Sequence, residues 1–256
     1  MSRRSPGPNW KAWLRRWDEQ QEAVLPNRER RFHVMLDVLE ATVGRSPRVL
    51  DLGSGPGSLS LRILERLPRA RCVAVDYDPV VLRIGQGALG SFGGRLTWVD
   101  AKLGASGWTK RLPKGKYDAA VSTTALHWLP PPSLRRVYRD LGGLLRPEGI
   151  FLNGDHLAWG SEDPRLLRLA ERVRRVHRHG VKRTTRWDAW ERWWKDAAEV
   201  PGLASSFAEH RRRQAQHPKE RSMPLEAHVR ALRRSGFSTV AVVWQIIDNR
   251  VLFAQR

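Results

Sequence analysis

From residue 48 to residue 155 the chain alternates short apolar runs with amphipathic segments. The apolar runs are rich in Val, Leu and Ala, as in strands buried on both faces, and the amphipathic segments repeat apolar residues at helical spacing. Strands that alternate with helices form parallel sheets with right-handed crossovers. Strands are predicted at residues 48–53, 72–77, 95–100, 117–123 and 149–155, and helices at 57–67, 79–89 and 132–145.

The C-terminal part of the chain has a different pattern. Residues 225–237 are amphipathic, and two apolar runs, 238–248 and 250–255, follow them. Asp248 and Asn249 lie between these runs and are typical of a tight hairpin turn. The predicted fold is therefore α/β: a Rossmann-like open twisted sheet, mostly parallel, with a C-terminal antiparallel hairpin and helices on both faces.

Two helical segments lie outside this alternation and divide the chain. Residues 1–44 are predicted to form a helical N-terminal segment, and residues 45–157 and 223–256 form the core that contains the sheet. Residues 158–222 are predicted to form a helical cap, inserted after the fifth strand. Open α/β sheets bind ligands at the carboxyl ends of their strands, and the cap is expected to lie over those ends.

The predicted cap is rich in arginine and tryptophan. Trp187, Trp190 and Trp194 share one helical face, which is expected to pack mainly on the core. If part of that face reaches the strand ends, the ligand there is apolar or aromatic. Arg183 and Arg186 are then candidates for pairing with an acidic group on that ligand.

The turn after the first predicted strand, "VLDLGSGPG", is the strongest chemical signal. Asp51 ends the strand, and Gly53, Gly55 and Gly57 follow at alternate positions. Glycine permits a positive φ and lets a ligand approach the backbone, while the helix that begins next presents free N–H groups. Dinucleotide folds use a similar turn, but Ser58 departs from their G-x-G-x-x-G spacing.

Acidic residues end the next two predicted strands. Asp76 is placed to accept hydrogen bonds from both ribose hydroxyls of a nucleoside. Asp78 precedes Pro79 and fits a helix N-cap. Asp100 either accepts a hydrogen bond from an adenine amino group or caps a loop. These positions indicate a site for a nucleoside-containing ligand.

These stretches, together with "VAVDYDP", "WVDA", "YDAAVSTTALHWL" and "LLRPEGIFL", resemble the class I S-adenosylmethionine-dependent methyltransferase family in order and spacing. The resemblance covers residues 45–157 well and the final helix and hairpin by pattern. It implies an enzyme that binds S-adenosylmethionine and releases S-adenosylhomocysteine. Glu148 stands where the family usually has the first glycine of Pro-Gly-Gly, in a turn remote from the chemistry.

The resemblance also implies a set of cofactor-binding residues at the ends of the first four strands. They are Asp51 (amino group or turn shape), Gly53, Gly55 and Gly57 (methionine part), Asp76 (ribose), Asp100 and Ala101 (adenine), and also Tyr77, Ser122 and His127, without assignment to a part of the cofactor.

The stretch "STTALHWL" carries the first candidate catalytic residue. His127 either takes a proton from a hydroxyl acceptor or forms the floor of the cofactor pocket with Trp128. Similar "ALHW" stretches occur in small-molecule members of the family, including carboxylate O-methyltransferases, whose acceptor is already ionised and needs no base. His156, at the end of the fifth strand, is the second candidate for contact with the acceptor.

Charge and cysteine content indicate which partners and which compartment suit this chain. The net charge of +20 is spread along the whole chain, which favours a solvated basic surface over a nucleic-acid site. The single cysteine, Cys72, is expected to be buried, and its isolation favours a reducing, cytoplasmic compartment.

No apolar run is long enough to span a membrane. His177 and His179 lack a nearby carboxylate or cysteine that would complete a metal site.

The favoured function is methylation of a small molecule at the oxygen of a carboxylate or hydroxyl group, by a monomer or homodimer. The alternative is an RNA or protein methyltransferase that uses the basic surface. It is disfavoured because "STTALHW" stands where enzymes that methylate nucleic-acid amino groups often have a (D/N)PPY-type stretch. A cofactor-binding protein without activity and a nicotinamide oxidoreductase are further, less favoured, interpretations.

Overall fold

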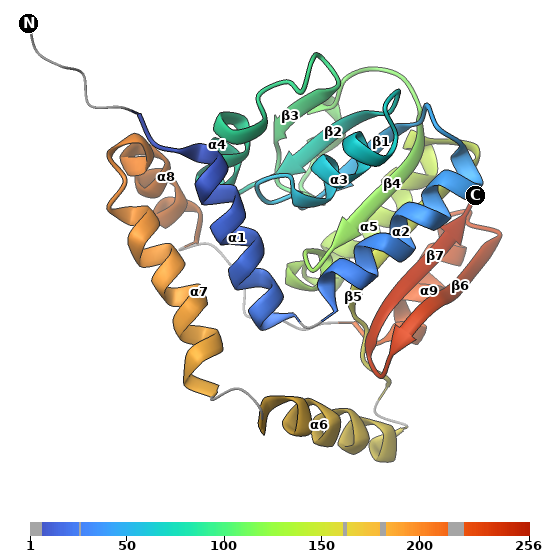
Figure 1. Cartoon of the computed structure of the whole chain (residues 1–256). Coiled ribbons are helices and arrows are strands. Elements are labelled where there is room, and N and C mark those ends of the chain that lie inside the picture. Colours follow the sequence, from blue (N-terminus) through green and yellow to red (C-terminus); the bar gives the residue numbers. More distant parts are fainter. Residues whose placement is uncertain (1–6, 26, 161–162, 180–182, 215–222) are drawn as a thin grey trace, which may run out of the picture.

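The computed structural model describes residues 7–25, 27–160, 163–179, 183–214 and 223–256 (Figure 1). Its centre is a seven-stranded sheet in the order β3-β2-β1-β4-β5-β7-β6. Neighbouring strands are parallel except where β7 pairs with β5 and β6. This confirms the predicted open sheet with a C-terminal antiparallel hairpin. The strands are β1 (Arg48–Leu52), β2 (Arg71–Asp76), β3 (Leu96–Asp100), β4 (Tyr117–Thr123), β5 (Leu145–His156), β6 (Thr239–Ile246) and β7 (Asn249–Gln255).

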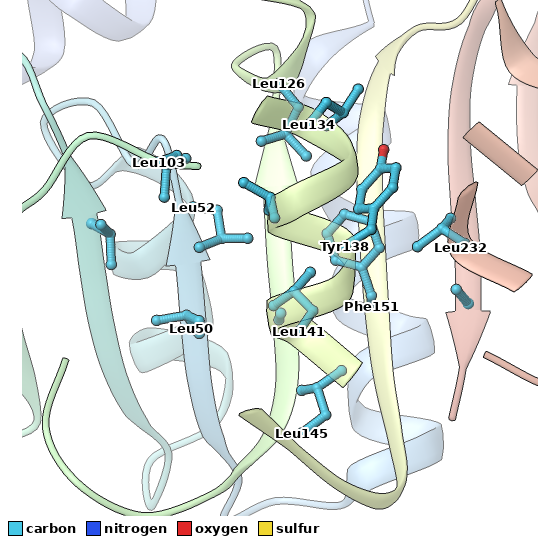
Figure 2. Packing of buried hydrophobic residues seen from close by; sticks show 14 of the residues in the cluster. Leu50, Leu52, Leu103, Leu126, Leu134, Tyr138, Leu141, Leu145, Phe151 and Leu232 are labelled. Carbon is cyan, nitrogen blue, oxygen red and sulfur yellow. The ribbon is translucent and has the colours of Figure 1, made fainter. Parts of the chain in front are cut away.

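Helices cover both faces of the sheet, each through an apolar face of its own. The helices α2 and α3 pack on one face, where Phe32 and Ile63 are fully buried. The helices α5 and α9 pack on the other. Figure 2 shows this second core, in which Tyr138 of α5 lies against Phe151 of β5 with ring centroids 5.6 Å apart. These four helices are α2 (Arg28–Val43), α3 (Ser58–Arg66), α5 (Pro131–Leu144) and α9 (Leu225–Arg234).

A third, aromatic cluster joins the N-terminal segment to the predicted cap. Helix α1 contacts both α4 and α7, and α8 contacts α4 (Figure 1). Trp193 of α7 lies against Trp13 and Trp17 of α1, with ring centroids 5.9 and 4.9 Å apart. The remaining helices are α1 (Trp10–Val24), α4 (Pro79–Leu89), α6 (Pro164–His179), α7 (Arg183–Ala198) and α8 (Ala204–Gln214), with 3₁₀ turns η1 (Trp108–Arg111), η2 (Leu126–Trp128) and η3 (Pro201–Leu203).

The packing face of α7 differs from the face that helical spacing suggested. Trp193, which was not among the three tryptophans predicted to share that face, is 2% exposed and is more buried than Trp190 and Trp194. The reason is that α1 presents tryptophans of its own, and these interlock with Trp193. The side chains of Arg183, Arg186 and Trp187 lie outside the described residues.

The hairpin turn lies one residue earlier than predicted. The strand β6 ends at Ile246 and β7 begins at Asn249, so the turn consists of Ile247 and Asp248. Ile247 has a φ of +57°, which a β-branched residue rarely adopts. Asn249 is a strand residue instead, because its side chain accepts a buried hydrogen bond from Arg31, 3.0 Å long. That contact outweighs the preference of asparagine for a turn.

Three further expectations concern single residues and segments. Cys72 is buried, at 1% exposure, as predicted. Among the described residues, no helix combines the length and apolar character that a bilayer span needs. The same part of the chain holds no group of three or more His, Cys, Asp or Glu side chains suited to a metal ion. The side chains of His177 and His179 lie outside the described residues.

Candidate cofactor and acceptor site

The glycine turn joins β1 to α3 at the carboxyl end of the sheet. Gly53 has a φ of +68°, and a Cβ added to it would lie 2.3 Å from the Cβ of Ala125. Gly57 has a φ of +87°, and its added Cβ would lie 2.7 Å from the Trp98 ring. Glycine is therefore required at both positions by contacts inside the protein. The Gly53 contact also shows that the loop after β4 lies directly against the turn.

Gly55 faces the N-terminal segment. A Cβ added there would lie 3.6 Å from the ring of Trp17 in α1. Helix α1 is fixed at this place by Asp18, whose Oδ1 accepts a 2.6 Å hydrogen bond from the hydroxyl of Ser58, the first residue of α3. Arg62 of α3 also pairs with Asp18. The turn is thus enclosed by α1 on one side and by the loop after β4 on another.

Gly53→Ala is expected to destabilise the fold by about 3 kcal/mol, because alanine would meet Ala125 and adopt left-handed backbone. For a chain of this size the melting temperature should fall by roughly 6–12 °C. Gly93→Ala is the matched control, since Gly93 has a φ of +65° and no atom within 4 Å of an added Cβ. Equal melting temperatures for the two variants would contradict a cost from the Ala125 contact.

Asp51 is the buried acid at the end of β1. Its Oδ2 accepts a 2.6 Å hydrogen bond from the Ser60 hydroxyl. Its Oδ1 is buried and has no hydrogen-bond partner in the part of the chain that the structure describes. Burial raises the pKa of Asp51 to about 7, although the Ser60 hydrogen bond opposes this. An unpartnered carboxylate oxygen at this depth is suited to a cationic donor.

Asp76 ends β2 and organises the loop that follows. Its Oδ2 accepts a hydrogen bond from the N–H of Gly55 at 2.7 Å, and its Oδ1 accepts from the N–H groups of Tyr77 and Asp78 at 2.7 and 2.8 Å. Burial raises the pKa of Asp76 to about 6, against the lowering effect of these backbone donors. A carboxylate offers about four acceptor sites, and three are used here, so Asp76 keeps one site for a hydroxyl donor.

Asp100, at the end of β3, forms an ion pair with a residue of α8. Arg213 of α8 donates to both of its carboxylate oxygens, Nη1 to Oδ1 at 2.8 Å and Nη2 to Oδ2 at 2.9 Å. The same guanidinium lies over the ring of Tyr77, 4.4 Å from its centroid. Asp78 caps α4 as predicted, because its Oδ1 accepts from the N–H of Val80. The sequence assigned Asp100 to adenine and Tyr77 to the cofactor site, and it contained no sign of Arg213 beside them.

Two predicted cofactor-binding residues, Ser122 and Ala101, form hydrogen bonds to the protein backbone. Ser122 is fully buried, and its hydroxyl donates to the carbonyl of Leu52 at 2.8 Å, which ties β4 to β1. The N–H of Ala101 donates to the carbonyl of Asp76 at 2.9 Å. Both residues therefore shape the strand ends, and their cofactor contacts stay a prediction.

His127 lies on η2, directly after the loop that covers Gly53, and pairs with Asp155. Its Nδ1 is 2.9 and 3.0 Å from the two carboxylate oxygens of Asp155. Burial alone would raise the pKa of Asp155, but His127 and Arg31 lower it below its ordinary value. The ionised carboxylate keeps Nδ1 of a neutral His127 protonated, so Nε2 is the basic nitrogen of the ring.

Arg31 of α2 is a buried cation near the His127–Asp155 pair. It is fully buried, and donates from Nη2 to Thr123 Oγ1 at 2.9 Å and from Nη1 to Asn249 Oδ1 at 3.0 Å. Burial lowers the pKa of Arg31 to about 10, partly offset by the charge of Asp155. The guanidinium therefore stays charged at neutral pH and joins α2, β4 and β7 beside the His127–Asp155 pair.

His156 is separated from this pair. Successive strand residues point to opposite faces, so His156 and Asp155 diverge. Its Nδ1 is 3.6 Å from Asp248 Oδ1, and its side chain is 41% exposed. The structure thus brings His127 together with Asp155 and leaves His156 on the other side of β5. A role for His156 at the acceptor stays a prediction.

Comparison with known proteins finds methyltransferases whose sequences are similar to part of this chain. A family model described as a methyltransferase domain matches residues 49–149. An uncharacterized methyltransferase of Mycobacterium tuberculosis is 36% identical over 103 residues, which is 40% of this chain and 47% of that protein. The trans-aconitate 2-methyltransferase of Azoarcus sp. is 31% identical over 136 residues, 53% of this chain and 49% of that protein. The malonyl-[acyl-carrier protein] O-methyltransferase of Geobacter sulfurreducens is 32% identical over 117 residues, 46% and 41% of the two chains.

Solved structures share the fold across most of the chain. An O-methyltransferase family protein from Burkholderia thailandensis has a TM-score of 0.56 at 18% identity, over 96% of this chain and 69% of that one. The pyocyanin biosynthetic protein PhzM has a TM-score of 0.53 at 16% identity, over 94% and 61%. At these identities the likeness concerns the fold alone.

The sequence matches are confined to part of each protein. The chain spans about half the length of the curated relatives that it matches. The shared part holds the glycine turn and the acids at the carboxyl ends of β1, β2 and β3, which are neighbouring parallel strands of the sheet. Residues 49–149 therefore match a methyltransferase domain, and the fold around them is that of the class I S-adenosylmethionine-dependent methyltransferases that the sequence resembles.

Proposed function

We propose that this chain transfers a methyl group from S-adenosylmethionine to an oxygen atom of a small molecule, in a carboxylate or hydroxyl group. The observation that carries the proposal is the His127–Asp155 pair, which follows a loop packed against the glycine turn. Relatives named for methylation of trans-aconitate and of malonyl-[acyl-carrier protein] support an acidic acceptor.

The residues at the strand ends fit the cofactor. The unpartnered Oδ1 of Asp51 suits the cationic amino group of its methionine part. Asp76 retains one acceptor site for a ribose hydroxyl, and Asp100 and Tyr77 offer a carboxylate and a ring to adenine. When bound, S-adenosylmethionine supplies a methyl group activated by the adjacent sulfonium.

For a hydroxyl acceptor, the chain's own task is to hold the oxygen in line and remove its proton. A bound S-adenosylmethionine would supply the methyl group and leave as S-adenosylhomocysteine, and Nε2 of His127 would take the hydroxyl proton of the acceptor. Asp155 holds the ring by Nδ1 and stabilises the imidazolium that results. Arg31 keeps Asp155 ionised through its neighbouring charge, and is in this sense a positioning residue.

For a carboxylate acceptor, no proton has to be removed. His127 then orients the acceptor, and the buried positive charge of Arg31 favours an anion at this end of the sheet. In both cases most of the catalysis comes from alignment and exclusion of water, which contribute on the order of 7–11 kcal/mol in well-oriented reactions. Trp17 and the loop after β4 enclose the turn and supply that exclusion.

The experiment that tests the proposal has two stages. Calorimetric titration with S-adenosylhomocysteine measures cofactor binding, which we expect at micromolar affinity. Labelled methyl transfer is then measured with matched acceptors: small dicarboxylic and tricarboxylic acids, phenols, and a mixed RNA as the alternative substrate. Transfer to RNA alone would overturn the small-molecule proposal, and no binding by folded protein would overturn methyl transfer itself.

The affinity for S-adenosylhomocysteine is expected to fall as the pH drops from about 7.5 to about 5.5. Burial raises the pKa of Asp51 to about 7 and that of Asp76 to about 6, and the ligand needs both ionised. Binding lowers both pKa values, so their contribution is complete above the free values and is lost as the pH falls through them. Calorimetry at several pH values checks this. Asp51→Asn should remove the upper part of the dependence, and a flat wild-type profile would contradict it.

A further inference from the structure

Helix α8 of the cap rests on the loop that follows β2. His210 Nδ1 is 2.8 Å from Asp78 Oδ2, and Arg213 makes its two-point contact with Asp100. Arg213 also donates to the carbonyl of Tyr77. All of these partners lie at the ends of β2 and β3. The cap is thus attached to the cofactor side of the site, away from the His127–Asp155 pair.

Arg213 occupies the groups that suit adenine. A guanidinium and an adenine ring share three properties: both are planar, both donate N–H groups, and both stack on aromatic rings. Arg213 uses both carboxylate oxygens of Asp100 and lies over Tyr77, while Lys102 Nζ is 5.4 Å from the centroid of the same ring. Adenine would have to replace Arg213 at Asp100 and at the ring.

The contact is partly exposed and therefore reversible. The side chains of Arg213 and Asp100 are 17% and 41% exposed, and an ion pair in contact with water contributes little free energy. The aromatic contacts between α8 and α7 do not depend on Arg213. His210 stacks on Trp194 of α7 with centroids 4.9 Å apart, and Trp194 also contacts Trp17 of α1. Arg213 can thus leave while the aromatic contacts of α8 with α7 remain.

We propose that Arg213, at the end of α8, is a gate on the adenine end of the cofactor site: it covers Asp100 and Tyr77 and is displaced from them when the cofactor binds, while α8 stays on α7. The proposal rests on the cofactor use proposed above. Adenine and the guanidinium compete for Asp100 and for the face of Tyr77, so Arg213 leaves both on binding and returns after the product leaves.

Arg213→Ala, compared with Arg212→Ala, tests the competition. Arg212 is the adjacent residue of the same helix, is 76% exposed, and pairs only with Glu209 among the described residues. Calorimetric titration with S-adenosylhomocysteine should give about fivefold tighter binding for Arg213→Ala than for wild type, the loss of one partly exposed ion pair and one cation–π contact. Arg212→Ala should bind as wild type does.

The outcomes separate this proposal from the one on which it rests. Unchanged or weaker binding by Arg213→Ala, with wild type binding normally, overturns the gate and leaves cofactor use intact. Absence of binding in wild type and Arg213→Ala alike overturns cofactor use and the gate with it. Hydrogen exchange adds a direct readout: amides in the last turn of α8, around Arg213, should exchange faster on addition of S-adenosylhomocysteine to wild type, and protection of that turn instead would also overturn the gate.

Discussion

Replacing His127 with alanine is expected to reduce kcat for a hydroxyl acceptor by about 100- to 10,000-fold while the affinity for S-adenosylhomocysteine stays within about twofold. The reason is the orientation of the ring. Asp155 holds Nδ1, so Nε2 is the group that takes the acceptor proton. Without it the hydroxyl must lose its proton to water. Labelled methyl transfer measures kcat, and calorimetry measures the affinity.

Two further variants separate chemistry from packing in this experiment. Trp128→Ala is the control, because Trp128 lies beside His127 on η2 and is 53% exposed. Asp155→Asn keeps the shape of the pair but favours the opposite tautomer, so kcat should fall nearly as far as in His127→Ala. A fall of less than about tenfold for His127→Ala on every hydroxyl acceptor would show that His127 is only a wall of the pocket. With a carboxylate acceptor the same variant should raise KM more than it lowers kcat.

Asp76→Ala is expected to weaken binding of S-adenosylhomocysteine by about 10- to 100-fold, because a hydrogen bond from a ribose hydroxyl to a charged acceptor is lost. The loop also loses its organiser, since the Asp76 carboxylate accepts from the N–H groups of Gly55, Tyr77 and Asp78. Affinity by calorimetry and melting temperature by calorimetric scanning are measured together, so that loss of the site is distinguished from loss of the fold.

Asp118→Ala is the matched control for Asp76→Ala. Asp118 also accepts hydrogen bonds, from the backbone N–H of Arg48 and from the Arg146 side chain. It lies at the start of β4, however, at the edge of the sheet opposite the carboxyl ends of the strands. It should lower stability without changing affinity. If Asp76→Ala folds and binds within about threefold of wild type, the assignment of the ribose to Asp76 is wrong.

The elements that could be predicted are those with local signals. Apolar runs bounded by glycine and proline gave the strands to within a few residues, and the helix at residues 79–89 agrees with α4 at both ends. The acids Asp51, Asp76 and Asp100 were placed at strand ends because each closes an apolar run. Parallel strands bring such ends to one edge of the sheet, so their proximity followed from topology.

The contacts that could not be predicted join elements far apart in the sequence. Arg213 meets Asp100 only because α8 folds back over β2 and β3, and no local pattern encodes that path. Arg31 had a signal that the sequence analysis did not use. It lies among the apolar positions of α2, next to Phe32, and a buried arginine requires hydrogen-bonding partners. His156 and Asp155 are adjacent in sequence, and strand alternation alone separates them.

The hydrogen bond between Arg31 and Asn249 has a consequence for the order in which the protein forms during synthesis. The two residues are 218 positions apart. The glycine turn and Asp76 leave the ribosome early, and their mutual contacts are short-range. The guanidinium of Arg31 must wait for β7, the last strand of the sheet, before its Asn249 partner exists. A nascent chain is therefore expected to gain its nucleoside-binding loops well before the buried charge beside His127 and Asp155 is held in place, and turnover should be a property of the completed chain alone.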